Sequence, residues 1–437
     1  MSTTQADLTL SSRVRALKPS VTVAFTNRAK QMRASGVDVL GFAAGEPDFG
    51  TPQAIKDAAK RGLDEGLTRY QPTLGPMPVR ETIATKLRDE NNIGAAPGGP
   101  QLTGEHVAIG CGGKHVLYSA MHALLGSADA DGQPDEVLLP TPAWVSYRPI
   151  AELAGAEVSE IPAGPETDFK ITPEQLRAAI TPRSRLLVIN SPSNPCGTMY
   201  SESELRALAA VVAEAAATTA PRLLILTDEI YEKIVYGGID HFSLGSIPEI
   251  AERTLTLNGM SKAYAMTGWR IGYAAMPGDF GKAVIKALGT LQGQMTTNIT
   301  AFNYPAITEA LTNPQVAQEV EQMRRAFAKR AKLIEQRLGT IDGINCPKPT
   351  GAFYVFPDVS ALFGKTTPKG AKLTSATTFS EALLEEAHVA FVPGEDFGGP
   401  GANHVRISFA CSEDQINAGM DRFKSFCSKL DLAGGQS

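Results

Sequence analysis

Residues 254–270 read Thr254-Leu-Thr-Leu-Asn-Gly-Met-Ser-Lys-Ala-Tyr-Ala-Met-Thr-Gly-Trp-Arg270. The alternating threonines and leucines predict a short strand, and Asn258-Gly259 predicts a tight turn at its end. A turn after a strand exposes the next side chains in a cleft, so we expect Lys262 to lie in one. Lys262 and Arg270 would suit an amine that attacks a carbonyl group beside a phosphate anchor. An isolated Ser-Lys pair is most often a solvated surface charge, so the rest of the chain must support this interpretation.

The chain has 437 residues, enough for two domains or for one large and one small domain. Its apolar fraction of 43% and charged fraction of 20% are ordinary for a globular protein, and a net charge of −5 argues against nucleic-acid binding. No apolar run approaches the roughly 20 residues that cross a bilayer. The first residues lack the features of a signal peptide, so we expect a cytoplasmic protein without a membrane partner.

Five cysteines and six histidines are scattered along the chain. The cysteines form no CxxC pair and the histidines no HExxH arrangement, which favours free thiols and gives no reason to assign a metal.

Short apolar segments alternate with helical patterns through most of the chain, which predicts an α/β fold with a mostly parallel sheet covered on both faces. The expected strands are Val37–Ala43, one at His106, Glu136–Leu139, Glu157–Ile161, Leu186–Asn190, Leu223–Thr227, Thr254–Leu257 and Ile271–Ala275. The expected helices are Val21–Gln31, Ala54–Glu65, Val79–Asn91, one after Gly113, Trp144–Ala154, Pro173–Ala179 and Ser201–Ala217. Ser201 with Glu204, and Thr172 before Pro173, are typical helix starts.

A long charged helix at Asn313–Leu338 is expected to lead into a C-terminal part with short strands, a Gly364–Thr377 loop and a final helix at Ser412–Leu430. The expected strands of this part are Ala352–Phe356, Val389–Val392 and His404–Phe409. The predicted organisation is a mobile tail (1–12), an N-terminal arm with part of a small domain (13–53), a large domain (54–310) and a C-terminal small domain (311–437).

Polar residues stand where the predicted strands end, and ligands of open α/β sheets bind there. Gly112-Gly113 precedes a helix, an arrangement in which free N–H groups and the helix dipole hold a phosphate. Asp228 ends a buried strand, where its carboxylate can keep a ring nitrogen protonated. Tyr231 and Asn194 can donate hydrogen bonds to an oxygen on the same aromatic ring of a bound ligand. Trp144 offers a flat face for stacking, although simple core packing is the commoner role of a tryptophan.

From about Ser11 to Leu430 these segments resemble, in the same order, the class I pyridoxal-phosphate (PLP) aminotransferases, in particular the aspartate aminotransferases of the Ib subgroup. The resemblance implies PLP fold type I, with a mostly parallel seven-stranded sheet domain and a smaller α+β domain. In that family the counterpart of Lys262 is bound covalently to the cofactor, and Asp228 and Tyr231 match the other catalytic positions. The implied cofactor-binding residues are Tyr70, Gly112, Gly113, Lys114, Trp144, Asn194, Asp228, Tyr231, Lys262 and Arg270.

The resemblance also implies a substrate site and a partner. The substrate residues would be Gly45, Trp144, Asn194, Arg406 and Lys18. A bidentate Arg406 would grip the α-carboxylate, and Lys18, in Lys18-Pro-Ser-Val-Thr22, would bind the distal one. Tyr70 looks like the tyrosine that reaches the phosphate of a neighbouring subunit, which implies a homodimer.

The expected activity is transamination between aspartate or glutamate and 2-oxoglutarate or oxaloacetate, with prephenate as a further acceptor. Lys262 would move the substrate proton as base and then acid. The alternatives are an aromatic- or alanine-type aminotransferase, a carbon–sulfur lyase of the same fold, and a non-catalytic PLP-fold regulator. The chain departs from the family pattern at Cys196, where threonine is common, and in extra residues at Ser127–Asp135 and Gly364–Thr377.

Overall fold

A computed structural model describes residues 10–11, 14–15, 17, 21–96, 99–126 and 132–432. Lys18, most of the predicted tail and part of the extra segment at Ser127–Asp135 lie outside these residues.

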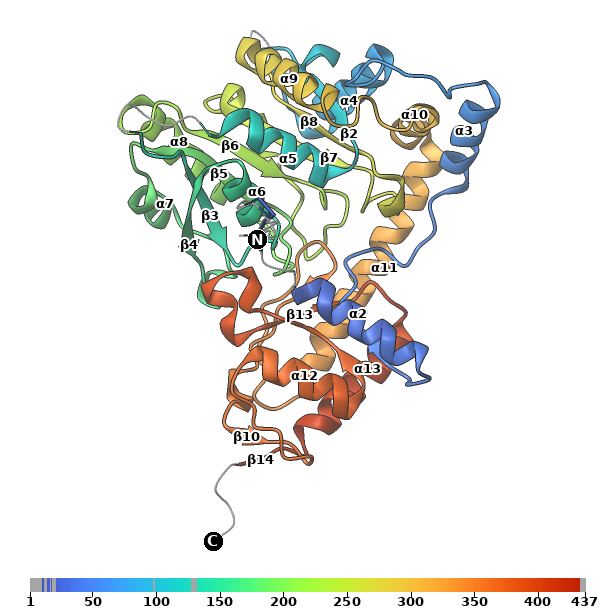
Figure 1. Cartoon of the computed structure of the whole chain (residues 1–437), viewed down its shortest axis with the longest axis vertical. Helices are drawn as coiled ribbons and strands as arrows, with labels where there is room; N and C mark the ends of the chain where they lie inside the picture. The colour runs from blue at the N-terminus through green and yellow to red at the C-terminus, as the bar shows by residue number, and fades with distance from the viewer. Residues whose placement is uncertain are drawn as a thin grey trace, which may run out of the picture.

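A seven-stranded sheet with the order β2-β8-β7-β6-β5-β3-β4 forms the upper part of the molecule in Figure 1. Neighbouring strands are parallel except at β8, which runs antiparallel to both β2 and β7. This confirms the mostly parallel seven-stranded sheet. The strands are β2 (Val107–Gly110), β3 (Glu136–Thr141), β4 (Glu157–Pro162), β5 (Ser184–Asn190), β6 (Leu224–Asp228), β7 (Thr254–Gly259) and β8 (Gly272–Ala275).

Helices cover both faces of this sheet, which explains why its strands are continuous apolar runs. In β6, Leu224 and Leu226 pack in one core with α5, α6 and α9, whereas Ile225 packs in another core with α7 and α8. A third core joins β2 and β8 to α3, α4 and α10. The helices are α3 (Gln53–Asp64), α4 (Met77–Asn91), α5 (Gly113–Leu124), α6 (Tyr147–Leu153), α7 (Pro173–Ala179), α8 (Glu202–Ala217), α9 (Gly278–Gly293) and α10 (Tyr304–Thr312).

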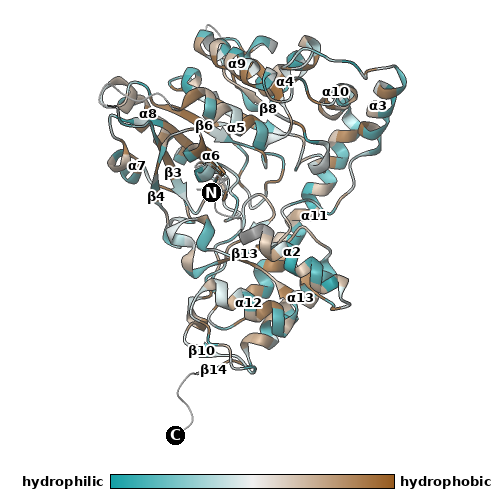
Figure 2. Ribbon diagram, in the orientation of Figure 1, coloured by the Kyte–Doolittle hydropathy of each residue, from teal (hydrophilic) through white to brown (hydrophobic). Residues whose placement is uncertain are grey.

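The long helix α11 (Pro314–Leu338) runs from this upper part into a lower part built on small sheets (Figure 1). β12, β13 and β9 form an antiparallel sheet, β1 pairs with β11 and β10 with β14. These elements are β1 (Leu40–Gly41), β9 (Tyr354–Val355), β10 (Lys365–Thr366), β11 (Val389–Ala390), β12 (Val392–Pro393), β13 (Val405–Ser408), β14 (Asp431–Leu432), α2 (Val21–Ala34), α12 (Ala376–Ala387) and α13 (Glu413–Cys427). In Figure 2 the outer helices carry both hydrophilic and hydrophobic colours, as expected for helices with one face on a core.

Several local predictions need correction. Asn258-Gly259 is no turn: both residues are buried in the end of β7, and Gly259 pairs with Gly272 of β8. The strand predicted at Val37–Ala43 shrinks to two residues, and the helix predicted from Trp144 begins at Tyr147. The segment Gly364–Thr377 is not all loop, because it contains β10 and the first residues of α12.

Helices α9, α10 and α12 were not predicted. The sequence of α9 contains four glycines, which weaken the helical signal, and its packing against α5 outweighs that propensity. The predicted helix starts are confirmed, since Ser201 and Thr172 each accept a hydrogen bond from the backbone at the third helical position. Among the described residues, no helix is both long and apolar enough to cross a membrane.

The backbone of Gly272, the first residue of β8, packs closely against the backbone of Gly112 and Gly113, and this contact can be tested. A Cβ atom there would lie 2.3 Å from the backbone nitrogen of Gly113, and neither backbone can rotate away. We expect Gly272→Ala to lower the free energy of unfolding in urea by about 1–3 kcal/mol. Gly293→Ala is the control, because its Cβ would meet no atom within 4 Å. Equal stability of the two variants would contradict this account.

Candidate active site

A pocket of about 540 Å³ opens where β5, β6 and β7 end, between the large sheet and the small sheets. Its charged lining residues are Lys30, Glu46, Lys114, Asp228, Lys262, Arg270 and Arg406. Five of them are cations and two are carboxylates, so the pocket favours an anionic ligand.

Lys262 follows the end of β7 by three residues, and its side chain is half-buried in a pocket, in agreement with the expectation that it lies in a cleft. Its ammonium group donates a hydrogen bond to the carbonyl oxygen of Gly45. Burial lowers the pKa of Lys262 to about 8, and Arg406 and Arg270 act in the same direction, whereas Glu46 and Asp228 oppose them. An amine with such a pKa is partly deprotonated near neutral pH and can act as a nucleophile or a base.

Asp228 is the last residue of β6, and its carboxylate is buried at the pocket wall. Oδ2 accepts a hydrogen bond of 2.7 Å from the hydroxyl of Tyr147, and Oδ1 accepts one of 3.2 Å from the backbone of Ile230. Burial raises the pKa of Asp228 to about 6, although both hydrogen bonds favour the ionised form. A cationic ring nitrogen would supply the charge partner that this carboxylate requires.

Two tyrosine hydroxyls meet at 3.0 Å on the wall of the pocket, those of Tyr231 and Tyr354. Burial raises the pKa of Tyr231 well above its ordinary value, so the phenol stays protonated and can donate. Tyr354, from β9, also limits the space beside Gly45, where a Cβ atom would lie 2.9 Å from the tyrosine oxygen.

Arg406, in β13 of the lower part, is a buried cation that lines the pocket. Its guanidinium donates to Oδ1 of Asn194 at 3.0 Å and to the carbonyl of Ala43 at 2.9 Å. Its Nε is buried without a hydrogen-bond partner among the described residues. Burial lowers the pKa of Arg406, but a guanidinium remains charged. A buried cation with an unused donor suits a carboxylate ligand.

Asn194 is oriented by this contact, because its carbonyl oxygen accepts from Arg406. The amide nitrogen is then available to donate to a ligand in the pocket. Asn190, at the end of β5, accepts from the backbone of Asn194 at 2.9 Å and donates to the carbonyl of Asp228 at 2.9 Å. Asn190 therefore holds the ends of two strands in register around the pocket.

An anion cradle forms where α5 begins. Gly112 precedes the helix with φ +89°, and a Cβ atom on it would lie 2.5 Å from Nη2 of Arg270. Gly113, Lys114 and Arg270 line the same end of the pocket. A helix N-terminus beside a guanidinium has the donors and the positive charge to bind an anion such as a phosphate group.

Trp144 lines the pocket between this cradle and Asp228. The ammonium of Lys114 lies 4.8 Å from the centre of its ring, and Tyr147 packs against it edge-on at 5.4 Å. Trp144 is half-buried, so it is not simply a core residue.

Tyr70 and Gly112 are predicted site residues that do not line the pocket: the side chain of Tyr70 is 87% exposed, whereas Gly112 lies directly behind the guanidinium of Arg270. Lys18 lies outside the described residues. Sequence reasoning missed the pocket residues Thr26, Asn27, Lys30, Glu46, Tyr147, Asn190 and Tyr354. Tyr147 carried a signal, since it follows Trp144 by three residues at a predicted strand end, but its partner Asp228 is 81 residues away.

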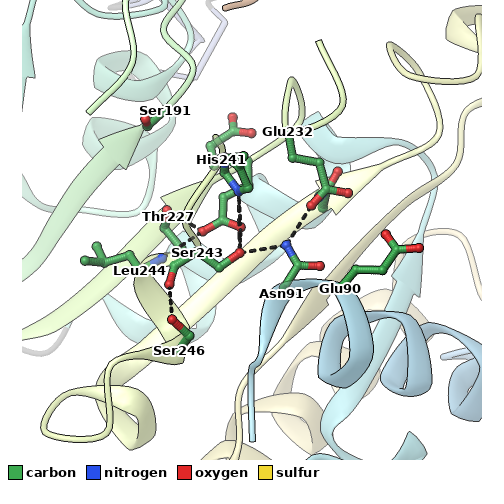
Figure 3. A network of polar contacts seen from close by, with 12 residues as sticks. Glu90, Asn91, Ser191, Thr227, Glu232, His241, Ser243, Leu244 and Ser246 are labelled. Carbon is green, nitrogen blue, oxygen red and sulfur yellow. Dashed lines mark hydrogen bonds and ion pairs between the residues drawn. The ribbon is translucent and has the colours of Figure 1, made fainter. Parts of the chain in front are cut away.

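A second polar network, whose residues do not line the pocket, lies between α4 and the segment that follows β6 (Figure 3). Glu229 accepts from Ser243 at 2.6 Å and contacts His241 at 3.2 Å, and Asn91 joins Ser243 to Glu232. Ligand atoms of Glu229, Glu232 and His241 lie within 4.8 Å of one another, a grouping that the sequence did not predict.

A buried cation already serves this network. The ammonium of Lys86 donates to Glu232 and to Asn91. Burial would raise the pKa of Glu232, but nearby positive charge, chiefly that of Lys86, lowers it to about 2. We therefore interpret the network as the tie that fixes α4 to the end of β6.

Comparisons with known proteins agree with this geometry. The model of the family "aminotransferase class I and II" matches residues 37–423. The aspartate/prephenate aminotransferase of Cereibacter sphaeroides is 43% identical over 422 residues, which span 96% of this chain and 99% of that protein. The aspartate aminotransferase of Geobacillus stearothermophilus is 42% identical over 421 residues, 95% of this chain and 98% of that protein.

Solved structures show the same fold. The aspartate aminotransferase from Rhizobium meliloti superposes with a TM-score of 0.88 at 36% identity, covering 97% of this chain and 100% of that one. The Thermus thermophilus aspartate aminotransferase with maleate gives a TM-score of 0.84 at 40% identity, covering 96% and 100% of the two chains.

The raised pKa of Asp228 predicts a pH-dependent stability. A buried acid whose pKa rises from 3.8 to about 6 opposes folding when ionised, and this cost grows between those two values and is complete above pH 6. We expect apoprotein carrying Asp228→Asn to exceed the wild type in free energy of unfolding at pH 8, by up to about 3 kcal/mol, and by less at pH 5. Thermal and urea unfolding at both pH values would measure this. A variant that is less stable than the wild type at pH 8 would contradict the assignment.

Proposed function

Because the chain belongs to the class I and II aminotransferase family, we propose that it transfers the amino group of aspartate or glutamate to 2-oxoglutarate or oxaloacetate with PLP as cofactor. The observation that carries the proposal is a lysine with a lowered pKa, Lys262, in one pocket with Asp228 and Arg406. The names of the relatives support the choice of aspartate.

The residues of the pocket fit the cofactor. The start of α5, with Gly112, Gly113, Lys114 and Arg270, suits its phosphate, and the buried Asp228 suits a protonated pyridine nitrogen. Tyr231 and Asn194 can donate hydrogen bonds to the ring oxygen of the cofactor, and Trp144 offers a face on which the ring can stack. When bound, PLP supplies an electron sink for the charge that develops at the substrate α-carbon.

The protein residues do the remaining work. Arg406 binds the substrate α-carboxylate through its guanidinium, and the backbone beside Gly45 closes that end of the pocket. Lys262 accepts the α-proton as general base and returns it as general acid, for which a pKa of about 8 is well placed. Asp228, held by Tyr147, keeps its charge against the ring nitrogen.

The alternatives differ in how well they are supported. A non-catalytic regulator is disfavoured, because the relatives and structural neighbours reported above are enzymes. Prephenate is a second candidate acceptor, since one relative is named an aspartate/prephenate aminotransferase. An aromatic- or alanine-type specificity and lyase chemistry have no specific support in the pocket, whose excess of cations favours dicarboxylates.

Lys262 provides the direct test. Purified protein incubated with PLP should be yellow, and borohydride should fix the cofactor to the peptide that contains Lys262. Lys262→Ala should abolish both the fixed label and turnover, whereas Lys332→Ala, at an exposed position of α11, should change neither. Peptide mass spectrometry locates the label, and a label on a different lysine would refute the assignment.

We propose that the enzyme is a homodimer in which Tyr70 completes the site of the other subunit. Its side chain is 87% exposed, and the helices on either side of its loop in the sequence, α3 and α4, carry the exposed apolar residues Leu63 and Met77. The loop of Tyr70 is fixed rather than loose, because Asn298 accepts from the backbone of Gln71 at 3.1 Å and Gln292 donates to Thr73 at 2.7 Å. An exposed aromatic side chain on a fixed loop, with exposed apolar residues on the adjoining helices, is typical of an interface.

Mixing two inactive or weakened subunits tests this arrangement. Tyr70→Phe alone should weaken PLP binding about tenfold, the loss expected for one hydrogen bond to a phosphate. In a mixed dimer of one Tyr70→Phe subunit and one Lys262→Ala subunit, the site that keeps Lys262 receives a native Tyr70 from the other subunit. PLP titration of the mixture should therefore show a class of sites with wild-type affinity. Sedimentation that shows a monomer, or a mixture without such sites, would contradict the shared site.

A further inference from the structure

The connection between β7 and β8 (residues 260–271) carries both Lys262 and Arg270. Two of its residues, Ala265 and Arg270, have φ values of +52° and +58°. Residues with a Cβ atom disfavour this left-handed conformation, so they keep it only where the surrounding structure holds them. The spacing between the amine of Lys262 and the guanidinium of Arg270 therefore depends on contacts made to this connection.

Thr51 supplies two such contacts from outside the connection. Its hydroxyl donates to the carbonyl oxygen of Ala265 at 2.7 Å and accepts from the indole nitrogen of Trp269 at 3.1 Å. Ala265 is one of the two left-handed residues, and Trp269 directly precedes the other. One hydroxyl thus joins the middle of the connection to its end.

Thr51 is held in place by the element that follows it. Pro52 and α3 come next in the chain, and α3 packs on the core that it shares with α4, α10, β2 and β8. Ala265 and Trp269 pack against the same core. Because Thr51, Ala265 and Trp269 are all half-buried, their hydrogen bonds are partly shielded from water. Thr51 therefore ties the connection to a fixed part of the upper half of the molecule.

Two neighbouring contacts to the same connection are less suited to hold it. Glu46 accepts from the hydroxyl of Thr267 at 3.0 Å, but Glu46 is exposed, so water competes for its carboxylate. The contact of Lys262 with Gly45 uses the amine itself, which the proposed function assigns to the cofactor. The hydroxyl of Thr51 has no such second task, because Thr51 does not line the pocket.

We infer that the hydroxyl of Thr51 is a positioning group that sets the spacing between the amine of Lys262 and the anion cradle beside Arg270. This inference rests on the proposed PLP chemistry and adds a residue that acts through Ala265 and Trp269 without touching the ligand. A ligand bound at two points gains affinity because its second attachment occurs at a high effective concentration, and this gain is lost when the two points are wrongly spaced. Loss of the hydroxyl should therefore weaken ligands that use both points more than ligands that use one.

The experiment measures the binding of three ligands to the apoprotein. PLP uses both the amine and the cradle, inorganic phosphate uses only the cradle, and pyridoxal, which lacks the phosphate, uses only the amine and the ring site. Thr51→Val, which replaces the hydroxyl by a methyl group of similar size, should weaken PLP binding about tenfold. The affinities for inorganic phosphate and for pyridoxal should stay nearly unchanged. Thr51→Ser keeps the hydroxyl and should restore the affinity for PLP.

Thr181→Val is the matched control. The hydroxyl of Thr181 also donates once, to Glu136 at 2.6 Å, and accepts once, from the backbone of Arg183 at 3.2 Å. Thr181 is half-buried as Thr51 is, and it does not line the pocket. Both valine variants should show a similar fall in the urea midpoint, whereas only Thr51→Val should lose affinity for PLP.

Trp269→Phe gives a second test that does not require Thr51→Val to fold. It removes only the hydrogen bond from the indole nitrogen, so PLP should bind more weakly than to the wild type and inorganic phosphate should bind equally well. In the double variant with Thr51→Val, the losses should be less than additive, because both changes remove the same contact.

Four results would overturn the inference: wild-type affinity for PLP in Thr51→Val, an equal loss in Thr181→Val, a loss of phosphate affinity as large as that of PLP, or no recovery in Thr51→Ser. A wild-type protein that binds no PLP would instead refute the proposed function. The two failures are thus distinguishable.

Discussion

Hydrogen bonds through Asn190 and Asn194 join the two sides of the pocket. Asn190 connects the end of β5 to the carbonyl of Asp228, and Asn194 passes the connection to Arg406 in β13. Arg406 then reaches Ala43, next to the segment that contacts Lys262. The side-chain amide of Asn190 uses both its donor and its acceptor side, and the carbonyl oxygen of Asn194 accepts from Arg406, so a rotation of either amide would break these hydrogen bonds. The separation between the carboxylate and the guanidinium therefore depends on these two asparagines.

Much of the sheet could be predicted because burial on both faces leaves a simple pattern in the sequence. Asp228 was recognisable for that reason, as a carboxylate at the end of an apolar strand. The family resemblance then supplied roles that composition and spacing alone could not give, such as the contact of Arg406. The positions of Lys262 and Arg270 near one another agree with both lines of reasoning.

The errors have physical causes. Asn-Gly is a strong turn signal, but Gly259 pairs with Gly272, and this close strand contact overrides the local preference. Tyr147 and Tyr354 act through partners that are 81 and 123 residues away, and such pairs have no periodicity to detect. The pocket face of α2 was missed because a helix shows its buried face in the sequence, not the cavity to which its polar face is turned.

The single antiparallel strand of the large sheet has a mechanical consequence. Since β8 returns beside β7, Lys262 and Arg270 belong to one short connection between two paired strands. Any displacement of that connection carries the reactive amine and the anion anchor together, as a rigid unit. The distance between Lys262 and Arg270 is therefore independent of movements of the lower part, which instead change the position of Arg406 relative to both.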